Sequence, residues 1–273
     1  DGGKYNTYVG ANSGYYNVNG YNNTSLGYYS GYYLSSGINN TCLGANAGYC
    51  TSTTGNGSDN VFIGYNTITQ GGDNNVYIGS NSGYNASSDD GVFLGHESGY
   101  NSTGNGNILI GKQSGKSITT SSYNVCFGHQ AGYNIVGNDN TISTGYTGNV
   151  LLGYRAGYNM DQNSSRNIIL GPNAGPPSDE TDNEHHNKIY IDTIGGDTNP
   201  LIFGDQSDIN SPTLSFNAEV SIRKGIELLG PESDNSTSGY TGTPHKWYIR
   251  IPRGYTSSSN GQYYLDRNIQ IGT

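Results

Sequence analysis

Charge and aliphatic side chains are both scarce in this 273-residue chain. Charged residues make up 12% of the sequence and hydrophobic residues 32%, whereas soluble globular domains average about 25% and about 45–50%. The chain therefore lacks the apolar material for one large core, and a typical α/β enzyme is not expected. It also lacks the high charge that keeps long disordered chains soluble.

Basic residues and long apolar runs are missing as well. Twelve Lys and Arg stand against 21 Asp and Glu, for a formal net charge of −9. A nucleic-acid partner is not expected, because backbone phosphates require a basic face. No apolar run reaches the length of about 18 residues that a membrane-spanning helix needs, so membrane insertion is not expected either.

Cysteines are few, and the motifs of common catalytic and metal sites are absent. Cys42, Cys50 and Cys126 cannot all pair within one chain, and no Cys-x-x-Cys pair occurs, so we expect small buried thiols and no zinc site. Nucleophile-elbow, zinc-protease and Walker-type motifs are missing, as is the glycine-aspartate pattern of calcium β-rolls. We predict a protein that is not an enzyme and holds no metal or cofactor.

Glycine and tyrosine, by contrast, are abundant, with 43 and 25 copies. Many of them belong to a repeat that reads Asn, three strand-like residues, Gly, two variable residues, a small residue, and usually Gly-Tyr. Ten copies occur, and each is called a rung here. Successive rungs are mostly about 16–17 residues long. The first glycines of the ten rungs are Gly10, Gly27, Gly44, Gly64, Gly79, Gly95, Gly111, Gly128, Gly153 and Gly171.

The second and fourth positions of each rung are the most uniform. All ten second positions are β-branched and all ten fourth positions are sizeable apolar residues, as in Val61 and Ile63. Because side chains alternate along a strand, these two positions share one face. We predict that this face fills the interior of a coil.

The third position then points outward, although most of its residues are also apolar. A single slender coil has no second layer to cover them, so we predict that neighbouring copies of the chain do so. The predicted oligomer interface consists of Tyr8, Phe62, Tyr77, Phe93, Leu109, Leu151 and Ile169.

These patterns predict an all-β fold: a β-solenoid or β-roll of ten rungs in an elongated homotrimer, followed by a small C-terminal β domain. Residues 1–175 form the repeat shaft and residues 176–187, which open on Pro176-Pro177, form a linker. Residues 188–273 form the C-terminal domain. Its expected strands are 188–191, 200–203, 213–216, 220–222, 226–229, 246–251 and 263–265.

A tyrosine follows the second glycine in seven rungs. If the rungs stay in register, these rings form a ladder along one edge of the coil. Structural stacking explains such a ladder, and the alternative is a glycan-binding strip, because aromatic faces suit sugar CH groups. The candidate ligand-binding residues are Tyr15, Tyr32, Tyr49, Tyr84, Tyr100, Tyr133 and Tyr158.

Eight Asn-x-Ser/Thr sequons mark candidate N-glycosylation sites in a chain that passes through a eukaryotic secretory route. They begin at Asn22, Asn23, Asn39, Asn56, Asn85, Asn101, Asn163 and Asn235.

The repeat resembles those of trimeric fibrous surface proteins. It is similar to tail-fibre-like proteins of phages and other viruses, in which Gly-Tyr-rich repeats lead into segments like Asn187–Asp192 and Asn199–Asp205. More distantly it resembles the head of trimeric autotransporter adhesins. The resemblance implies an elongated extracellular homotrimer on a virion or cell surface, with a host glycan or receptor as partner. Two alternatives stay open: a cell-surface adhesin or self-assembling filament, and a polysaccharide-degrading tailspike.

Overall fold

The computed structural model describes residues 3–50, 57–67, 70–135, 148–160, 164–177, 185–193, 200–206 and 212–217. These residues form one sheet of thirteen strands whose order along the sheet is the order along the chain. The expected all-β solenoid is confirmed. None of the described segments forms a helix with the length and apolar character needed to cross a membrane.

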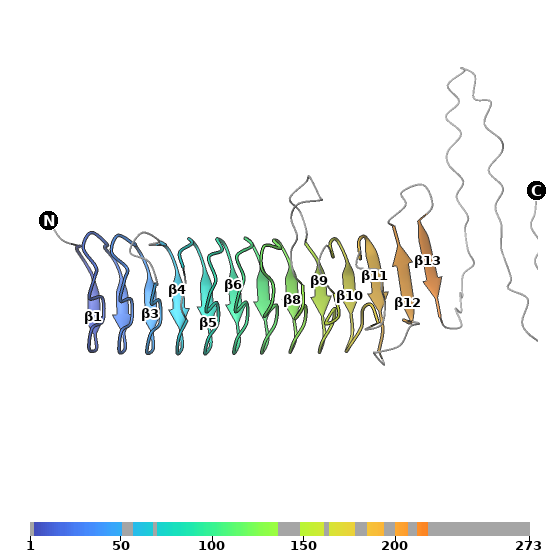
Figure 1. Ribbon diagram of the computed structural model, residues 1–273, viewed down its shortest axis with the longest axis horizontal. Coiled ribbons are helices and arrows are strands. Elements are labelled where there is room, and N and C mark those ends of the chain that lie inside the picture. Colours follow the sequence, from blue (N-terminus) through green and yellow to red (C-terminus); the bar gives the residue numbers. More distant parts are fainter. Residues whose placement is uncertain are drawn as a thin grey trace, which may run out of the picture. The chain divides into compact units, whose positions relative to one another are not determined.

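Each rung contributes one three-residue strand at the predicted place, and the ten strands stand in a row (Figure 1). Neighbours are parallel and in register, so that Tyr77 lies opposite Phe93. Residues one rung apart therefore become neighbours at the strand spacing of about 4.8 Å. The strands are β1 (Thr7–Val9), β2 (Thr24–Leu26), β3 (Thr41–Leu43), β4 (Val61–Ile63), β5 (Val76–Ile78), β6 (Val92–Leu94), β7 (Ile108–Ile110), β8 (Val125–Phe127), β9 (Val150–Leu152) and β10 (Ile168–Leu170).

The sheet continues beyond the predicted end of the shaft. Strand β11 (Lys188–Ile191) pairs in parallel with β10, and β12 (Ile202–Asp205) and β13 (Thr213–Phe216) then add antiparallel. The shaft therefore does not end at residue 175, and the strand expected at 200–203 is shifted to Ile202–Asp205. The strands expected at 220–222, 226–229, 246–251 and 263–265 lie outside the described residues, as does most of the linker.

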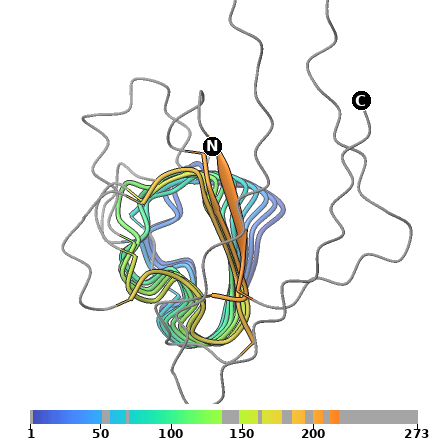
Figure 2. The same cartoon turned by 90° about the vertical axis from the view of Figure 1, so that its right-hand side faces the viewer.

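Seen along the row, the rungs overlie one another as a closed outline (Figure 2). The glycine after each strand makes this stacking possible. Gly95 has a φ of 139°, and a Cβ built on it would lie 2.6 Å from the carbonyl oxygen of Gly111 on the next rung. No other residue fits so close to a neighbouring backbone, because its side chain would collide with that carbonyl group.

The interior of the coil is lined by the third position of each strand, not by the second and fourth. Phe62, Tyr77, Phe93, Leu109, Leu151 and Ile169 are all 0% exposed, and Tyr8 on the terminal rung is half-buried. The prediction that these residues form an outward oligomer interface is therefore wrong. The side chains alternate along each strand as predicted, but the inward and outward faces of the strands are the reverse of the prediction.

The asparagine that opens each rung explains this reversal. Its side chain lies inside the coil, where the Asn124 amide nitrogen donates to Asn107 Oδ1 at 3.0 Å and Asn124 Oδ1 accepts the Asn149 backbone N–H at 3.0 Å. Most of the asparagines thus pair with those on neighbouring rungs, and the column is interrupted only at the rung that opens on Gly91. Because side chains alternate along a strand, an inward first position brings the third position inward as well.

Core volume is balanced within single rungs. A second inward column follows the Gly-Tyr turn, and it holds a small residue where the third position is aromatic and a larger aliphatic residue where the third position is small. Phe93 shares its rung with Ser102, whereas the small Cys126 shares its rung with Ile135. A Cβ built on Gly132 would lie 2.7 Å from Cys126 Sγ and 3.0 Å from Ile135 Cδ1, so both side chains meet beside this turn.

This balance predicts that Cys126→Phe destabilises the fold by about 1–3 kcal/mol through overpacking against Ile135. Ile135→Ala alone leaves a cavity that costs about 2–5 kcal/mol. We expect the double variant to lose less stability than the sum of the two, because it reproduces the Phe93–Ser102 combination. Denaturant unfolding of the four proteins measures this coupling, and strictly additive losses would contradict it.

Candidate functional site

The outward face of the parallel sheet is apolar apart from three threonines on its first three rungs. The second and fourth strand positions form two side-by-side columns, and Val9, Phe127 and Ile168 are 54%, 56% and 42% exposed. Leucine or isoleucine fills most of the fourth column. This surface, called the outer strand face here, consists of residues 7, 9, 24, 26, 41, 43, 61, 63, 76, 78, 92, 94, 108, 110, 125, 127, 150, 152, 168 and 170.

The tyrosines that follow the turns stack in three separate groups. Tyr32 stacks on Tyr15 and on Tyr49, with ring centroids 5.6 Å and 5.4 Å apart. The other two groups are the stacked pairs Tyr84–Tyr100 and Tyr133–Tyr158, at 4.9 Å and 5.3 Å. The seven candidate residues thus lie in one column, as the register requires, but Lys116 stands between the second and third groups.

The first three rungs carry a denser aromatic surface than the seven residues alone indicate. Tyr16 stacks on Tyr33 at 4.9 Å and meets Tyr32 edge to face at 5.1 Å. Desolvation, then the neighbouring Tyr16 hydroxyl, raises the pKa of Tyr32 to about 12. Sequence reasoning missed Tyr16 and Tyr33, although the doublets Tyr15-Tyr16 and Tyr32-Tyr33 mark a second ring column.

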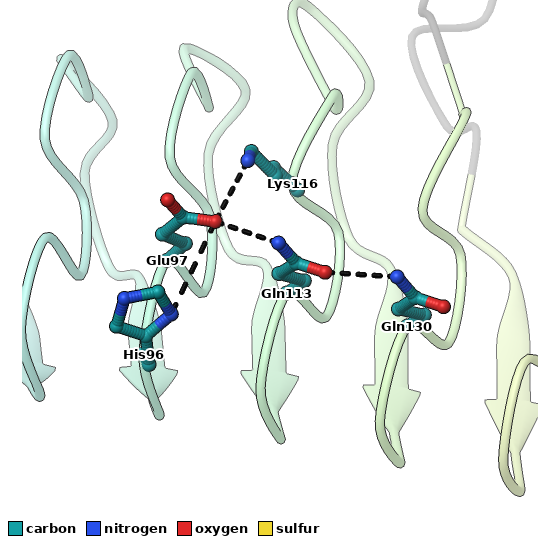
Figure 3. Close-up of polar contacts among 5 residues, drawn as sticks. All are labelled: His96, Glu97, Gln113, Lys116 and Gln130. Atoms are coloured by element: carbon teal, nitrogen blue, oxygen red, sulfur yellow. Dashed lines mark hydrogen bonds and ion pairs between the residues drawn. The ribbon is translucent and has the colours of Figure 1, made fainter.

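A polar column runs along the turns that follow the strands (Figure 3). Gln113 Nε2 donates to Glu97 Oε2 at 2.7 Å, and Gln130 Nε2 donates to Gln113 Oε1 at 2.8 Å. Lys116 Nζ also binds Glu97 Oε2 at 2.7 Å. The Gln113 amide and the Lys116 ammonium group together lower the pKa of Glu97, and the Glu97 carboxylate raises the pKa of Lys116.

The polar column continues to Arg155, whose Nε donates to Gln130 Oε1 at 2.7 Å. The side-chain amides of Gln113 and Gln130 therefore have the same orientation along the column. The column has an acidic end at Glu97 and a basic end at Arg155. Sequence reasoning did not identify this column. Its members all have positive φ, between 53° and 58°, and lie two residues after the strand glycine in their rungs.

The structure divides the candidate glycosylation sites into three groups. Asn23 is fully buried, and its amide nitrogen donates to the Gly37 carbonyl group at 2.7 Å. Asn23 cannot carry a glycan in the folded chain and is removed from the set. Asn22 and Asn39 are exposed, while Asn85 and Asn101 are half-buried and share a hydrogen bond of 3.0 Å. Asn56, Asn163 and Asn235 lie outside the described residues.

The described residues do not assemble reactive side chains. They contain no group of three or more His, Cys, Asp or Glu that could hold a metal ion. Cys42, Cys50 and Cys126 are free and buried. Desolvation raises the pKa of all three thiols, that of Cys50 to about 12, which suppresses the reactive thiolate.

No family model matches the chain, and it has no match among curated proteins or solved structures.

The Glu97 contacts predict a defined response to acid. A lowered carboxyl pKa in the folded chain adds stability that is present above the ordinary value of 4.5 and is lost as the pH falls through the folded value. We expect Glu97→Gln to make the free energy of unfolding less dependent on pH between about 6 and 3. Asp90→Asn is the control, because it removes an exposed carboxylate without a side-chain partner in the described part of the chain. Equal pH profiles for wild type and Glu97→Gln would contradict the prediction.

Proposed function

We propose that this chain is a non-enzymatic structural subunit of an extracellular fibre, in which three copies associate through the outer strand face. The fibre stands on a virion surface and presents a receptor- or glycan-binding surface. The exposed apolar outer strand face is the observation that carries this proposal. The resemblance of the repeat to trimeric tail-fibre proteins supplies the number of copies and the setting.

The size and composition of the outer strand face support self-association. Ten strands at about 4.8 Å make a strip of over 40 Å in length, which far exceeds the scattered apolar residues of ordinary protein surfaces. None of the twenty positions of the outer strand face holds a charged residue. Such depletion of charge is typical of the core of a protein interface.

The change from threonine to more apolar residues along the outer strand face favours a parallel association of the copies around the fibre axis. The first three second-position residues are Thr7, Thr24 and Thr41, and the later ones are valine or isoleucine. In a parallel assembly each level meets the same residues of the other copies, so threonine meets threonine and isoleucine meets isoleucine. An antiparallel arrangement would place the threonines against the most apolar rungs.

The two alternatives use the same surfaces differently. A cell-surface adhesin or filament subunit shares the outer strand face and adds contacts between shaft ends. A polysaccharide-degrading tailspike requires a pair of carboxyl groups about 5–10 Å apart. Glu97 is the only glutamate among residues 1–175, and Lys116 and Gln113 occupy one of its oxygens.

The tyrosines of the first three rungs support a glycan-binding role. Tyr15 and Tyr16 are 62% and 42% exposed while their rings contact those of Tyr32 and Tyr33. Stacking fixes the rings with little loss of conformational freedom on binding, and this makes a rigid aromatic surface for neutral sugars.

The first test is the mass of the assembly in solution. Sedimentation of the wild-type chain should give three times the chain mass of 29.0 kDa. Leu94→Lys and Phe127→Lys place a charge in the outer strand face, and we expect each to shift the protein to the monomer. Val18→Lys is the matched control, since Val18 is 57% exposed but lies away from the strands. A monomeric wild-type protein would refute the assembly, and a dimer would refute its trimeric form.

The second test concerns the tyrosines. We expect the triple variant Tyr15→Ala, Tyr32→Ala, Tyr49→Ala to lose binding to neutral glycans on an array by at least about tenfold, because each stacking surface contributes up to about 1–1.5 kcal/mol. Tyr65→Ala is the control, because Tyr65 is 55% exposed and has no ring partner among the described residues. Unchanged binding by a triple variant that remains folded would contradict the role.

A further inference from the structure

A pocket of about 270 Å³ lies beside the basic end of the polar column, on the ninth and tenth rungs. Eight residues line it, and they combine one cation, one aromatic ring, two amides and two prolines: Arg155, Tyr158, Asn159, Asn173, Ala174, Gly175, Pro176 and Pro177. Its volume is close to the lower end of the range for small-molecule sites. The pocket therefore suits a single ring better than an extended oligomer.

Arg155 is held in place by uncharged groups. Its Nε donates to Gln130 Oε1 at 2.7 Å, and its guanidinium carbon lies 4.8 Å from the ring centroid of Tyr158 and 5.4 Å from that of Tyr154. Tyr158 is in turn supported by stacking on Tyr133. These contacts fix the guanidinium plane while using only one of its five N–H donors.

The positive charge of Arg155 is not neutralised in the described part of the chain. Lys116 and Lys188 form ion pairs with Glu97 and Asp205 at 2.7 Å and 2.6 Å, whereas no carboxylate there pairs with Arg155. Its two terminal nitrogens also have no acceptor among those residues. A fixed, half-buried guanidinium with free terminal nitrogens matches the planar geometry of a carboxylate group.

The other lining residues fit the body of a sugar. The tyrosine column ends at Tyr158 because Pro176 follows Gly175 on the next rung, and a pocket borders the ring there. Asn173 has no side-chain partner in the described residues, and Asn159 donates to the Pro176 carbonyl group at 3.3 Å, which leaves its own carbonyl oxygen to accept. Both amides are thus able to bind hydroxyl groups.

We propose that this pocket binds one acidic sugar residue, of the uronic or sialic acid class. Its carboxylate pairs with the terminal nitrogens of Arg155, its ring lies against Tyr158, and its hydroxyl groups contact Asn159 and Asn173. The inference rests on the proposed surface role for its biological meaning. It adds a site for charged glycans that is separate from the tyrosines of the first three rungs.

The test uses the full chain and the monosaccharides D-glucuronate and D-glucose in calorimetric or NMR titrations. We expect glucuronate to bind and Arg155→Gln to weaken its binding by at least about tenfold, the loss of one charge-assisted contact. This variant keeps the fold, because Gln113 and Gln130 occupy the same position on their rungs. Arg166→Gln is the matched control, since Arg166 is exposed and has a φ of 58°, close to the 53° of Arg155.

Three results would overturn the inference. They are equal affinity of wild type and Arg155→Gln for glucuronate, binding of glucose as tight as that of glucuronate, and binding of acetate as tight as that of glucuronate. The last would show a simple anion site without sugar recognition. Titration of Phe127→Lys with glucuronate distinguishes a failure of this inference from a failure of the proposed trimer. The pocket is formed within one chain, so a monomeric variant should keep its affinity for glucuronate.

Discussion

The hydrogen-bonded asparagine column inside the coil is the interaction on which the rest of the structure depends. Most of these amides pair with a neighbouring rung, and buried amides without partners are costly. The column therefore fixes the register of the rungs and the face of the strand that turns inward. The column is interrupted at the rung that opens on Gly91: the Gly91 backbone N–H still donates to Asn75 Oδ1 at 2.8 Å, but glycine brings no side-chain amide to continue the column.

The inward position of the asparagines determines which strand side chains face outward. Once the first position lies inside, the third follows it, and the second and fourth positions face outward with their branched apolar side chains. The interior of each rung then has room for one aromatic side chain beside a small one, or for two aliphatic side chains, which explains why Phe93 shares its rung with a serine and Leu109 shares its rung with Ile118. The apolar outer strand face is thus a direct consequence of a polar column in the core.

Much of the fold could be predicted from the sequence. The period of the repeat located all ten strands of the shaft, because glycine and asparagine mark the ends of each strand. The choice of face could not be made from apolar content, since both faces are apolar. The asparagine that precedes nearly every strand is more informative. A polar residue at a fixed place beside the strands is better explained by a buried column of hydrogen-bonded amides than by a loop. The pairing of β11 with β10 was not predicted, because residues 176–187, which open on Pro176-Pro177, resemble a linker in the sequence.

The surface features were harder to predict because they depend on stacking between rungs. The tyrosine column follows from the regular spacing of the repeat. The polar column is different, because its rungs differ in length. Its members become neighbours only because each lies in the same turn of its rung: Glu97, Gln113, Gln130 and Arg155. Positive φ at these positions holds the side chains in one line. An acidic and a basic end then arise from four residues spread over nearly sixty positions of sequence. The charge at the basic end is left beside a pocket because the tyrosine repeat gives way to Pro176 and Pro177 on the next rung. The regular positions of the repeat therefore build the shaft, and its interruption at Pro176 and Pro177 forms a pocket on the side of the shaft.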